Sequence, residues 1–401
     1  MKILFLANKV PWPLKDGGAI GTFSIAYGLA KSGCSIDMLA INTPKHHINT
    51  TDIPENIRKT MSIETVSIDT NISASKLLRN LILSKKPYIA ERFNHQIFEN
   101  ALIDKLKSNT YDIVILEMLY LSVYIQTIRE FSNAHITMRA PNIEHEIWMQ
   151  IAKNTKNPIK SIYLTNMAKR IKRMEKQVMN QYDSLIPVSQ VNADTYQKMG
   201  VNVPIFRTTT GVFIDQIPRH PKIEEENALA HIGALDWIPN FEGLSWFVNE
   251  VWPLILKQIP DINFYIAGRN ATEHTADYFN KKQIHYLGEV PDAYKFLQSK
   301  SILIVPLLSG SGMRVKIIEG LALGKSIVST EIGAEGIALE NNVHLKIANE
   351  PKAFAEACIQ LCRDKEQRKI LSQNGKQFVH ENYDNLKIAK NLREFYKKQV
   401  K

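Results

Sequence analysis

The chain has 401 residues, 44% of them hydrophobic and 22% charged, which excludes a disordered, collagenous or low-complexity protein and allows two domains of ordinary size. Lysine and arginine number 50 against 40 acidic residues, and the net charge of +10 favours anionic partners without choosing among phosphates, acidic lipids and nucleic acid. Three cysteines are too few for a disulfide framework, and no apolar run reaches the roughly 18 residues of a transmembrane helix.

The start of the chain does not have the pattern of a secretory signal. Its apolar run is short, and Pro11, Trp12 and Pro13 follow it instead of a small-residue cleavage site. With so few cysteines, a reducing compartment is the simplest location. We therefore expect a cytoplasmic protein.

Short apolar runs alternate with longer amphipathic segments along the first half of the chain. This alternation is typical of an α/β protein with parallel sheets. A helix is expected over 22–31, after a loop that contains Gly17 and Gly18. The expected strands of this half are 3–6, 35–41, 113–116, 136–138 and 184–188.

The second half repeats the alternation after a linker. Residues 213–227 hold two prolines, several charges and little periodicity, which indicates a linker. The expected strands are 228–232, 263–267, 284–286, 302–306 and 327–329. We therefore predict two facing doubly wound, Rossmann-like parallel-sheet domains, 1–212 and 213–384, with the helix 385–401 packing back on the first. Ligands of such sheets bind beyond the carboxyl ends of the strands, so a cleft between the domains is the expected site.

A Gly/Ser turn between the strand at 302–306 and a helix expected over 314–323 is the most informative stretch. Glycines let a backbone approach a ligand closely, and the first N–H groups of a helix attract anions. Arg314 and Lys316 are cations in the first turn, where the helix dipole disfavours them. An anionic ligand would explain them, and Glu319 one turn later could accept hydrogen bonds from sugar hydroxyls. The alternative is a plain strand–turn–helix with a solvated charged turn.

The whole stretch resembles the C-terminal signature of family 4 (group 1) glycosyltransferases, which have the GT-B fold; it runs ILIVPLLSGSGMRVKIIEGLALGKSIVSTEIGAEG. The shared features are a strand ending in Pro, a Gly/Ser loop, Arg-x-Lys, a helix with Glu and a Gly-x-x-Gly loop. Other parts of the family pattern are resembled, in order, by VSQVNADTYQKMG, HIGALDWIPNFEGLSWFVNEVWPLILKQIPDINFYIAG and LGEVPDAYKFLQSKSILIVP. The first half matches more loosely, through MKILFLAN, PLKDGGAIG and MRAPNIEHEIW.

The resemblance implies a retaining transferase that moves a sugar from a UDP- or GDP-sugar to a glycan or lipid-linked glycan, with no metal or cofactor. Arg314 and Lys316 would neutralise the departing diphosphate, and Glu319 would bind the ribose. The loop 233–240 would border the phosphates. The donor contacts implied in this half are Gly233, Gly288, Glu289, Val290, Gly310, Ser311 and Gly312.

Three departures from the family pattern keep other functions open. The family often has a second glutamate eight positions before Glu319, where this chain has Ser311. The loop 233–240 lacks the Arg and Lys that the family often places there, and Pro141 occupies the position of a family His. A non-catalytic nucleotide-binding scaffold and a nucleotide-sugar epimerase are therefore alternatives. No nucleic-acid partner is expected, because no aromatic residues cluster with the cations.

A polar cluster in RAPNIEHEIW follows a strand of the first half, at the expected ligand-facing edge. Glu144 or His145 is a candidate general base for the acceptor hydroxyl; a capped helix N-terminus is the alternative. Gly17 and Gly18 either bring a loop near the donor phosphates or form an ordinary connection.

Two basic stretches, 76–86 and 153–176, combine cations with apolar residues at helical spacing, and Glu175 is the one acid among them. Basic amphipathic helices bind anionic membranes, so peripheral membrane contact is one interpretation and a solvated helix face is the other. The histidines show no metal-ligand spacing, so no metal site is expected.

Overall fold

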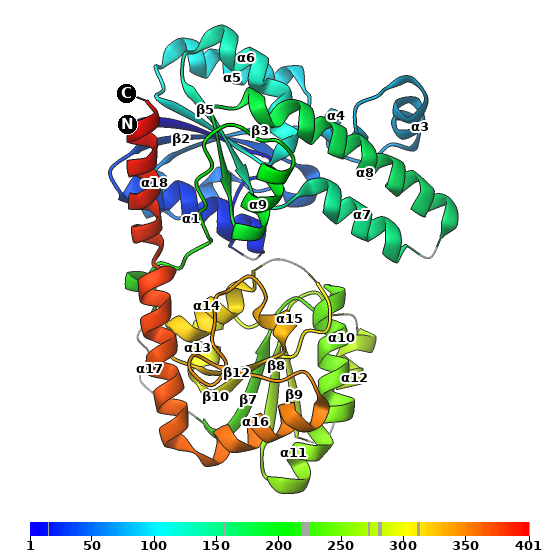
Figure 1. Cartoon of the computed structure of the whole chain (residues 1–401), viewed down its shortest axis with the longest axis vertical. Helices are drawn as coiled ribbons and strands as arrows, with labels where there is room; N and C mark the ends of the chain where they lie inside the picture. Colours follow the sequence, from blue (N-terminus) through cyan, green and yellow to red (C-terminus); the bar gives the residue numbers. More distant parts are fainter. Residues whose placement is uncertain are drawn as a thin grey trace. The chain divides into compact units, whose positions relative to one another are not determined.

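The computed structural model describes residues 1–14, 16–155, 157–218, 225–271, 273–279, 283–310 and 313–400. The chain divides into two compact units, Met1–Gly211 with Asn385–Lys401 and Val212–Asp384. Each unit holds a six-stranded parallel sheet with helices on both faces (Figure 1). The prediction of two doubly wound, Rossmann-like sheets is confirmed.

The sheet of the first unit has the strand order β3-β2-β1-β4-β5-β6. Its strands are β1 (Lys2–Ala7), β2 (Ser35–Asn42), β3 (Ser62–Ser67), β4 (Ile113–Glu117), β5 (His135–Ala140) and β6 (Ser184–Pro187). β1 and β4 are almost wholly apolar because helices cover both faces of a parallel sheet. The strand order reverses between these two neighbours, which is where such sheets bind ligands.

The helices of the first unit include one from the end of the chain. They are α1 (Gly17–Lys31), α2 (Glu55–Thr60), α3 (Ala74–Leu83), α4 (Tyr88–Glu91), α5 (Gln96–Ser108), α6 (Ile125–Phe131), α7 (Glu144–Asn154), α8 (Pro158–Val178), α9 (Gln190–Lys198) and α18 (Asn385–Gln399). α18 packs on α1, where the Asn385 Nδ2 donates a hydrogen bond of 2.6 Å to the Ser24 carbonyl.

The helix that follows β1 begins earlier than predicted. Gly17 and Gly18 form the first turn of α1, so the expectation that they lie in a loop before the helix was wrong. Asp16 supplies the reason: its Oδ1 accepts a hydrogen bond of 2.9 Å from the Ala19 N–H and caps the helix. The Lys9 Nζ lies 2.8 Å from the same oxygen and holds the cap in place.

The sheet of the second unit has the order β12-β11-β10-β7-β8-β9, the same winding as the first. Its strands are β7 (Glu225–Ile232), β8 (Asn263–Ala267), β9 (Ile284–Gly288), β10 (Lys300–Val305), β11 (Ser326–Ser329) and β12 (Lys346–Ile347). Its helices are α10 (Ile238–Trp246), α11 (Trp252–Gln258), α12 (Glu273–Phe279), α13 (Ala293–Gln298), α14 (Val315–Ala322), α15 (Glu331–Ala334), α16 (Pro351–Arg363) and α17 (Lys365–Asn382). The reversal point of this sheet lies between β7 and β10.

Several predicted boundaries in this unit need correction. β7 begins at Glu225, so the linker predicted over 213–227 ends sooner; residues 219–224 lie outside the described part. α14 begins at Val315, with Arg314 as its N-cap residue.

Among the described residues, none of the helices combines the length and apolarity needed to span a bilayer.

The contact between α1 and α18 gives a stability prediction. A Cβ on Gly28 would lie 2.7 Å from the Asn385 Nδ2 and 3.0 Å from the Ala389 Cβ. Gly28→Ala should therefore lower the free energy of unfolding by about 1–3 kcal/mol, measured by urea denaturation, although alanine favours helices. Gly17→Ala is the control because nothing lies within 4 Å of its Cβ position. Equal stability of the two variants would contradict this packing.

Candidate functional site

The reversal point of the second sheet gathers the predicted cations. Gly233 and Ala234 follow β7, and the segment after β10 leads to Arg314 and α14. β7 and β10 are hydrogen-bonded neighbours, so both segments leave the same edge of the sheet. The start of α14 therefore points its N–H groups to the position that parallel sheets use for ligands.

The Lys316 ammonium group lies directly over a glycine of this edge. Its Nζ donates a hydrogen bond of 3.0 Å to the Asn240 Oδ1, and the Asn240 Nδ2 donates one of 2.8 Å to the Ala234 carbonyl. A Cβ on Gly233 would lie 2.6 Å from the Lys316 Nζ. Gly233 is thus required for the lysine to reach this place.

Lys316 and Glu319 keep some exposed surface, yet protein atoms crowd their charged ends. Desolvation, helped by the nearby Arg314, lowers the pKa of Lys316 to about 7. Desolvation also raises the pKa of Glu319 to about 7, against the hydrogen bond of 3.1 Å that the Tyr294 hydroxyl donates to its Oε1. Lys316 and Glu319 therefore both have pKa values near neutral pH.

Arg314 is buried beside an aromatic ring. Its guanidinium carbon lies 5.3 Å from the centre of the Trp237 ring, a cation–π distance. Burial lowers the pKa of Arg314, and Glu335 acts in the opposite direction. A Cβ on Gly310, whose φ is +106°, would lie 3.1 Å from the Arg314 Nη2. Gly310 therefore lies close to this guanidinium.

Glycines end three neighbouring strands of the second sheet. The Gly233 N–H donates to the Ala267 carbonyl (3.0 Å), and the Gly268 N–H donates to the Gly288 carbonyl (2.8 Å). A Cβ on Gly268 would lie 2.1 Å from the Gly233 carbonyl oxygen, so only glycine fits there. The sequence analysis did not single out Gly268, although this glycine directly follows an apolar strand. The strand belongs to a block that resembles the family pattern.

The remaining predicted donor contacts are distributed over this edge. Gly288 ends β9, two strands from β7, and is followed by the exposed Glu289 and the partly buried Val290. These three lie at and after the end of β9, whereas Lys316 lies on α14 after β10. Ser311 and Gly312 lie outside the described residues. Tyr294, the partner of Glu319, was not predicted.

The first unit builds a second polar network at the start of α7. Glu175, fully buried on α8, accepts a hydrogen bond of 2.9 Å from the Glu144 N–H through Oε1 and one from the His145 Nδ1 through Oε2. Since a carboxylate only accepts, the His145 proton lies on Nδ1. No described residue forms a hydrogen bond with the Nε2 of His145. The sequence showed Glu175 only as the lone acid of a basic helix.

Glu144 is held in the same network by different partners. Its Oε2 accepts a hydrogen bond of 2.5 Å from the Tyr120 hydroxyl, which accepts one of 2.9 Å from the Trp148 Nε1. Burial, with a contribution from Glu175, raises the pKa of Glu144 to about 7 despite the Tyr120 hydrogen bond. Glu144 is thus tied to two aromatic residues, whereas His145 keeps one ring nitrogen outside the network.

Another buried ion pair lies where the first sheet reverses. Arg139 at the end of β5 donates to the Glu117 carboxylate at the end of β4. A Cβ on Gly21 of α1 would lie 2.6 Å from the Arg139 Nη2, so this glycine admits the guanidinium. Gly17 lies one turn before Gly21 on the same helix, and no atom lies within 4 Å of its Cβ position.

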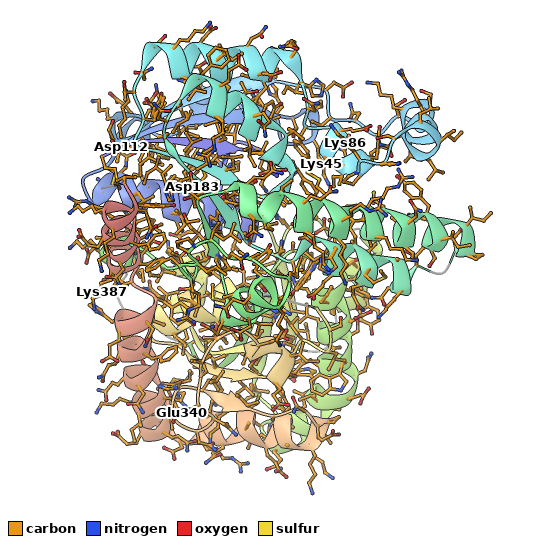
Figure 2. The ribbon with its side chains drawn as sticks, turned by 45° about the horizontal axis from the view of Figure 1, so that its top comes forward. Lys45, Lys86, Asp112, Asp183, Glu340 and Lys387 are labelled. Carbon is orange, nitrogen blue, oxygen red and sulfur yellow. The ribbon has the colours of Figure 1, made fainter. Side chains whose placement is uncertain are left out.

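Figure 2 shows the side chains of both units as sticks and makes clear how densely charged groups cover the surface. Within the described ranges, no three His, Cys, Asp or Glu side chains are grouped so as to hold a metal ion. The three cysteines are buried free thiols.

Comparison with known proteins agrees with this architecture. Residues 226–364 match the family model described as "Glycosyl transferases group 1". A protein of Klebsiella pneumoniae, described as an uncharacterized 44.6 kDa protein in cps region, is 24% identical over 405 residues. The match covers 98% of this chain and 98% of that protein.

Two solved structures share the fold over nearly the full length. Sucrose-phosphate synthase of Thermosynechococcus elongatus has a TM-score of 0.68 at 15% identity, with 99% of each chain covered. Anabaena HepE in complex with UDP has a TM-score of 0.67 at 13% identity, with 99% of this chain and 100% of that one covered. The expected resemblance to group 1 glycosyltransferases is confirmed. Residues 226–364 thus resemble group 1 glycosyltransferases, and the whole chain has the GT-B fold of two Rossmann-like domains.

Proposed function

We propose that the protein is a retaining glycosyltransferase that moves a sugar from a UDP- or GDP-sugar to a hydroxyl of a glycan or lipid-linked glycan. The observation that carries this proposal is the pair Arg314 and Lys316 at the start of α14, with the Lys316 ammonium over Gly233 at the reversal point of the sheet. The UDP complex of a protein with the same fold supports a nucleotide donor. Retention is carried over from the family that the signature resembles.

The departing diphosphate explains the two cations. Its negative charge grows as the bond to the sugar breaks, and preorganised cations and helix N–H groups stabilise growing charge in the transition state. Lys316 and Arg314 supply positive charge to the phosphates, which is why the proposal needs neither a metal ion nor a cofactor. Glu319, oriented by Tyr294, is suited to accept hydrogen bonds from the ribose hydroxyls.

The nucleobase would lie along the ends of β8 and β9. Gly288 has φ of +69° and gives the chain a sharp turn after β9. In this proposal the backbone of Gly288, Glu289 and Val290 contacts the edge of the base, while Gly310, Ser311 and Gly312 border the donor sugar and phosphates.

The acceptor would bind the first unit. Between the two candidate bases, His145 is favoured because its Nδ1 is held by Glu175 and its Nε2 remains able to accept a proton. Glu144 then serves to hold Tyr120 and the start of α7. Gly17 and Gly18, in the first turn of α1, border the acceptor or the phosphates. The reduced, buried cysteines are compatible with the cytoplasm, where we place the reaction.

The donor site is tested by thermal unfolding with UDP, GDP, ADP, CMP and dTDP. A nucleotide at about 100 times its dissociation constant adds about 2.7 kcal/mol of stability. We expect UDP or GDP to raise the melting temperature, and Arg314→Ala and Glu319→Ala to abolish the shift. Lys295→Ala and Glu331→Ala, exposed on the same unit, are matched controls that keep it.

Turnover then distinguishes the alternatives. Lys316→Met should lower kcat/KM for sugar transfer by about 100- to 1000-fold. A protein that binds the nucleotide but never releases diphosphate from its sugar would be a scaffold, and one that returns an epimer of the donor would be an epimerase. Either result contradicts the proposed transfer.

The role of Glu175 as a positioning residue gives a separate prediction. In Glu175→Gln the amide oxygen can still accept from the Glu144 N–H, but the NH₂ group then faces the His145 Nδ1 and should drive the neutral ring to its Nε2–H tautomer. The ¹⁵N shifts of the two ring nitrogens measure this change, and kcat should fall about 100-fold. The control is Glu146→Gln, because Glu146 is exposed and lies next to His145 on α7. An unchanged tautomer in Glu175→Gln would contradict the assignment.

A further inference from the structure

α3 exposes a face on which cations and large aliphatic side chains are mixed. Lys76, Arg79, Ile82 and Leu83 are all exposed, and with 3.6 residues per turn they lie within about one third of the helix circumference. The exposed fraction is 70% for Ile82 and 76% for Leu83. Adjacent exposed aliphatic residues of this size are unfavourable in water unless something covers them.

The helix that carries this face is anchored to α8. The Arg170 guanidinium donates hydrogen bonds to the carbonyls of Ser84 (2.9 Å), Leu81 (3.0 Å) and Asn80 (3.3 Å) at the end of α3. A cation at a helix C-terminus satisfies carbonyls that have no partner within the helix. The aliphatic pair therefore belongs to an anchored helix.

A basic cavity lies beside the same helix end. Its volume is about 280 Å³, and its lining includes Lys85, Lys86, Arg170 and Arg173. Glu91 is the one acid that lines it, and this carboxylate accepts a hydrogen bond of 2.5 Å from the Ser84 hydroxyl. The cavity is large enough for a phosphate group and carries an excess of positive charge.

The exposed part of α8 continues this character. Its only acid, Glu175, is fully buried, so all of the charged side chains it exposes are cations. Ile159, 79% exposed, lies near the start of the helix. Both views place α3 and the helices α7 and α8 on the same side of the first unit (Figures 1 and 2). The exposed cations of α8 are Lys160, Lys169, Lys172, Arg173 and Lys176.

We propose that this surface, the exposed face of α3 with the basic cavity and the exposed side of α8, docks on an anionic lipid bilayer. Ile82 and Leu83 enter the boundary between headgroups and acyl chains, and Lys85, Lys86 and Arg173 bind lipid phosphates. A soluble polyanion would pair with the cations but leave the aliphatic side chains in water. The inference does not depend on the transfer reaction, since none of these residues belongs to the proposed donor site.

Co-sedimentation of the full chain with vesicles tests the proposal. We expect binding to vesicles of equal parts phosphatidylcholine and phosphatidylglycerol, little binding to phosphatidylcholine alone, and weaker binding at high salt. Inorganic phosphate at the same phosphate concentration should not displace the protein from the vesicles.

Two double variants separate the charged and the aliphatic contributions. Lys85→Glu with Lys86→Glu should lower the partition coefficient about 30-fold or more, since each cation contributes about 1 kcal/mol near an anionic surface. Ile82→Ser with Leu83→Ser should lower it about tenfold or more. The controls are Lys198→Glu with Lys257→Glu, and Ile97→Ser on α5, whose side chain is 66% exposed.

Three results would overturn the proposal. They are equal binding to both kinds of vesicle, a loss in the control variants as large as in the Lys85 and Lys86 or the Ile82 and Leu83 variants, and full displacement by phosphate or heparin with no effect of Ile82→Ser and Leu83→Ser. Thermal stability and the nucleotide-induced shift of each variant show that it is folded. Failure of membrane binding and failure of donor binding are therefore seen separately.

Discussion

The desolvated ammonium of Lys316 at the start of α14 is the constraint on which the ligand-facing edge of the second sheet depends. A cation in the first turn of a helix opposes the helix dipole, and removal from water weakens its charged form. Burial and the nearby Arg314 lower its pKa to about 7. The surroundings hold the lysine there regardless: Gly233 leaves the space, and the Asn240 Oδ1 accepts a hydrogen bond from the Lys316 Nζ. A bound anion would supply the missing negative charge and make this arrangement favourable overall.

The sheet geometry makes this arrangement possible. Because β7 and β10 are parallel neighbours at the reversal point, the segments after them leave the same edge and bring Gly233 beside Lys316. Gly268 must be a glycine for the ends of β7 and β8 to lie so close together. The first unit uses the same edge of its own sheet for Arg139 and Glu117, which pair with each other. Its cation is neutralised within the protein, whereas Lys316 lies with another cation, Arg314, and a carboxyl group whose pKa is also near 7.

The sequence was most informative where burial is complete. Central strands such as β1 and β4 are continuous apolar runs, and they were predicted within one or two residues. The edge strand β3 was missed because buried or partly buried side chains alternate with exposed polar ones along it. β12 was missed because it spans only two residues. The start of α1 was misplaced because Gly17 and Gly18 suggested a loop, whereas Asp16 caps the helix just before them.

The candidate site was predictable where residues are neighbours in the chain. Arg314, Lys316 and Glu319 share one motif on one helix. Tyr294 and Glu175 act from other elements, and nothing in their local sequence distinguishes them. Glu175 even lies in a helix whose other charges are basic, so that sequence alone suggests a solvated position. Only packing shows that it is fully buried and holds His145.

The most direct test of this account is the proton balance of nucleotide binding at about pH 8. With a pKa of about 7, Lys316 is mostly neutral there in the free protein, and a bound diphosphate should restore its proton. Calorimetry of UDP or GDP binding in buffers of different ionisation enthalpy should show uptake of nearly one proton, absent in Lys316→Arg because arginine stays charged throughout. For the same reason affinity should fall as pH rises above 7. Binding without proton uptake, or equal uptake by Lys316→Arg, would contradict the claim that Lys316 gains a proton when the diphosphate binds.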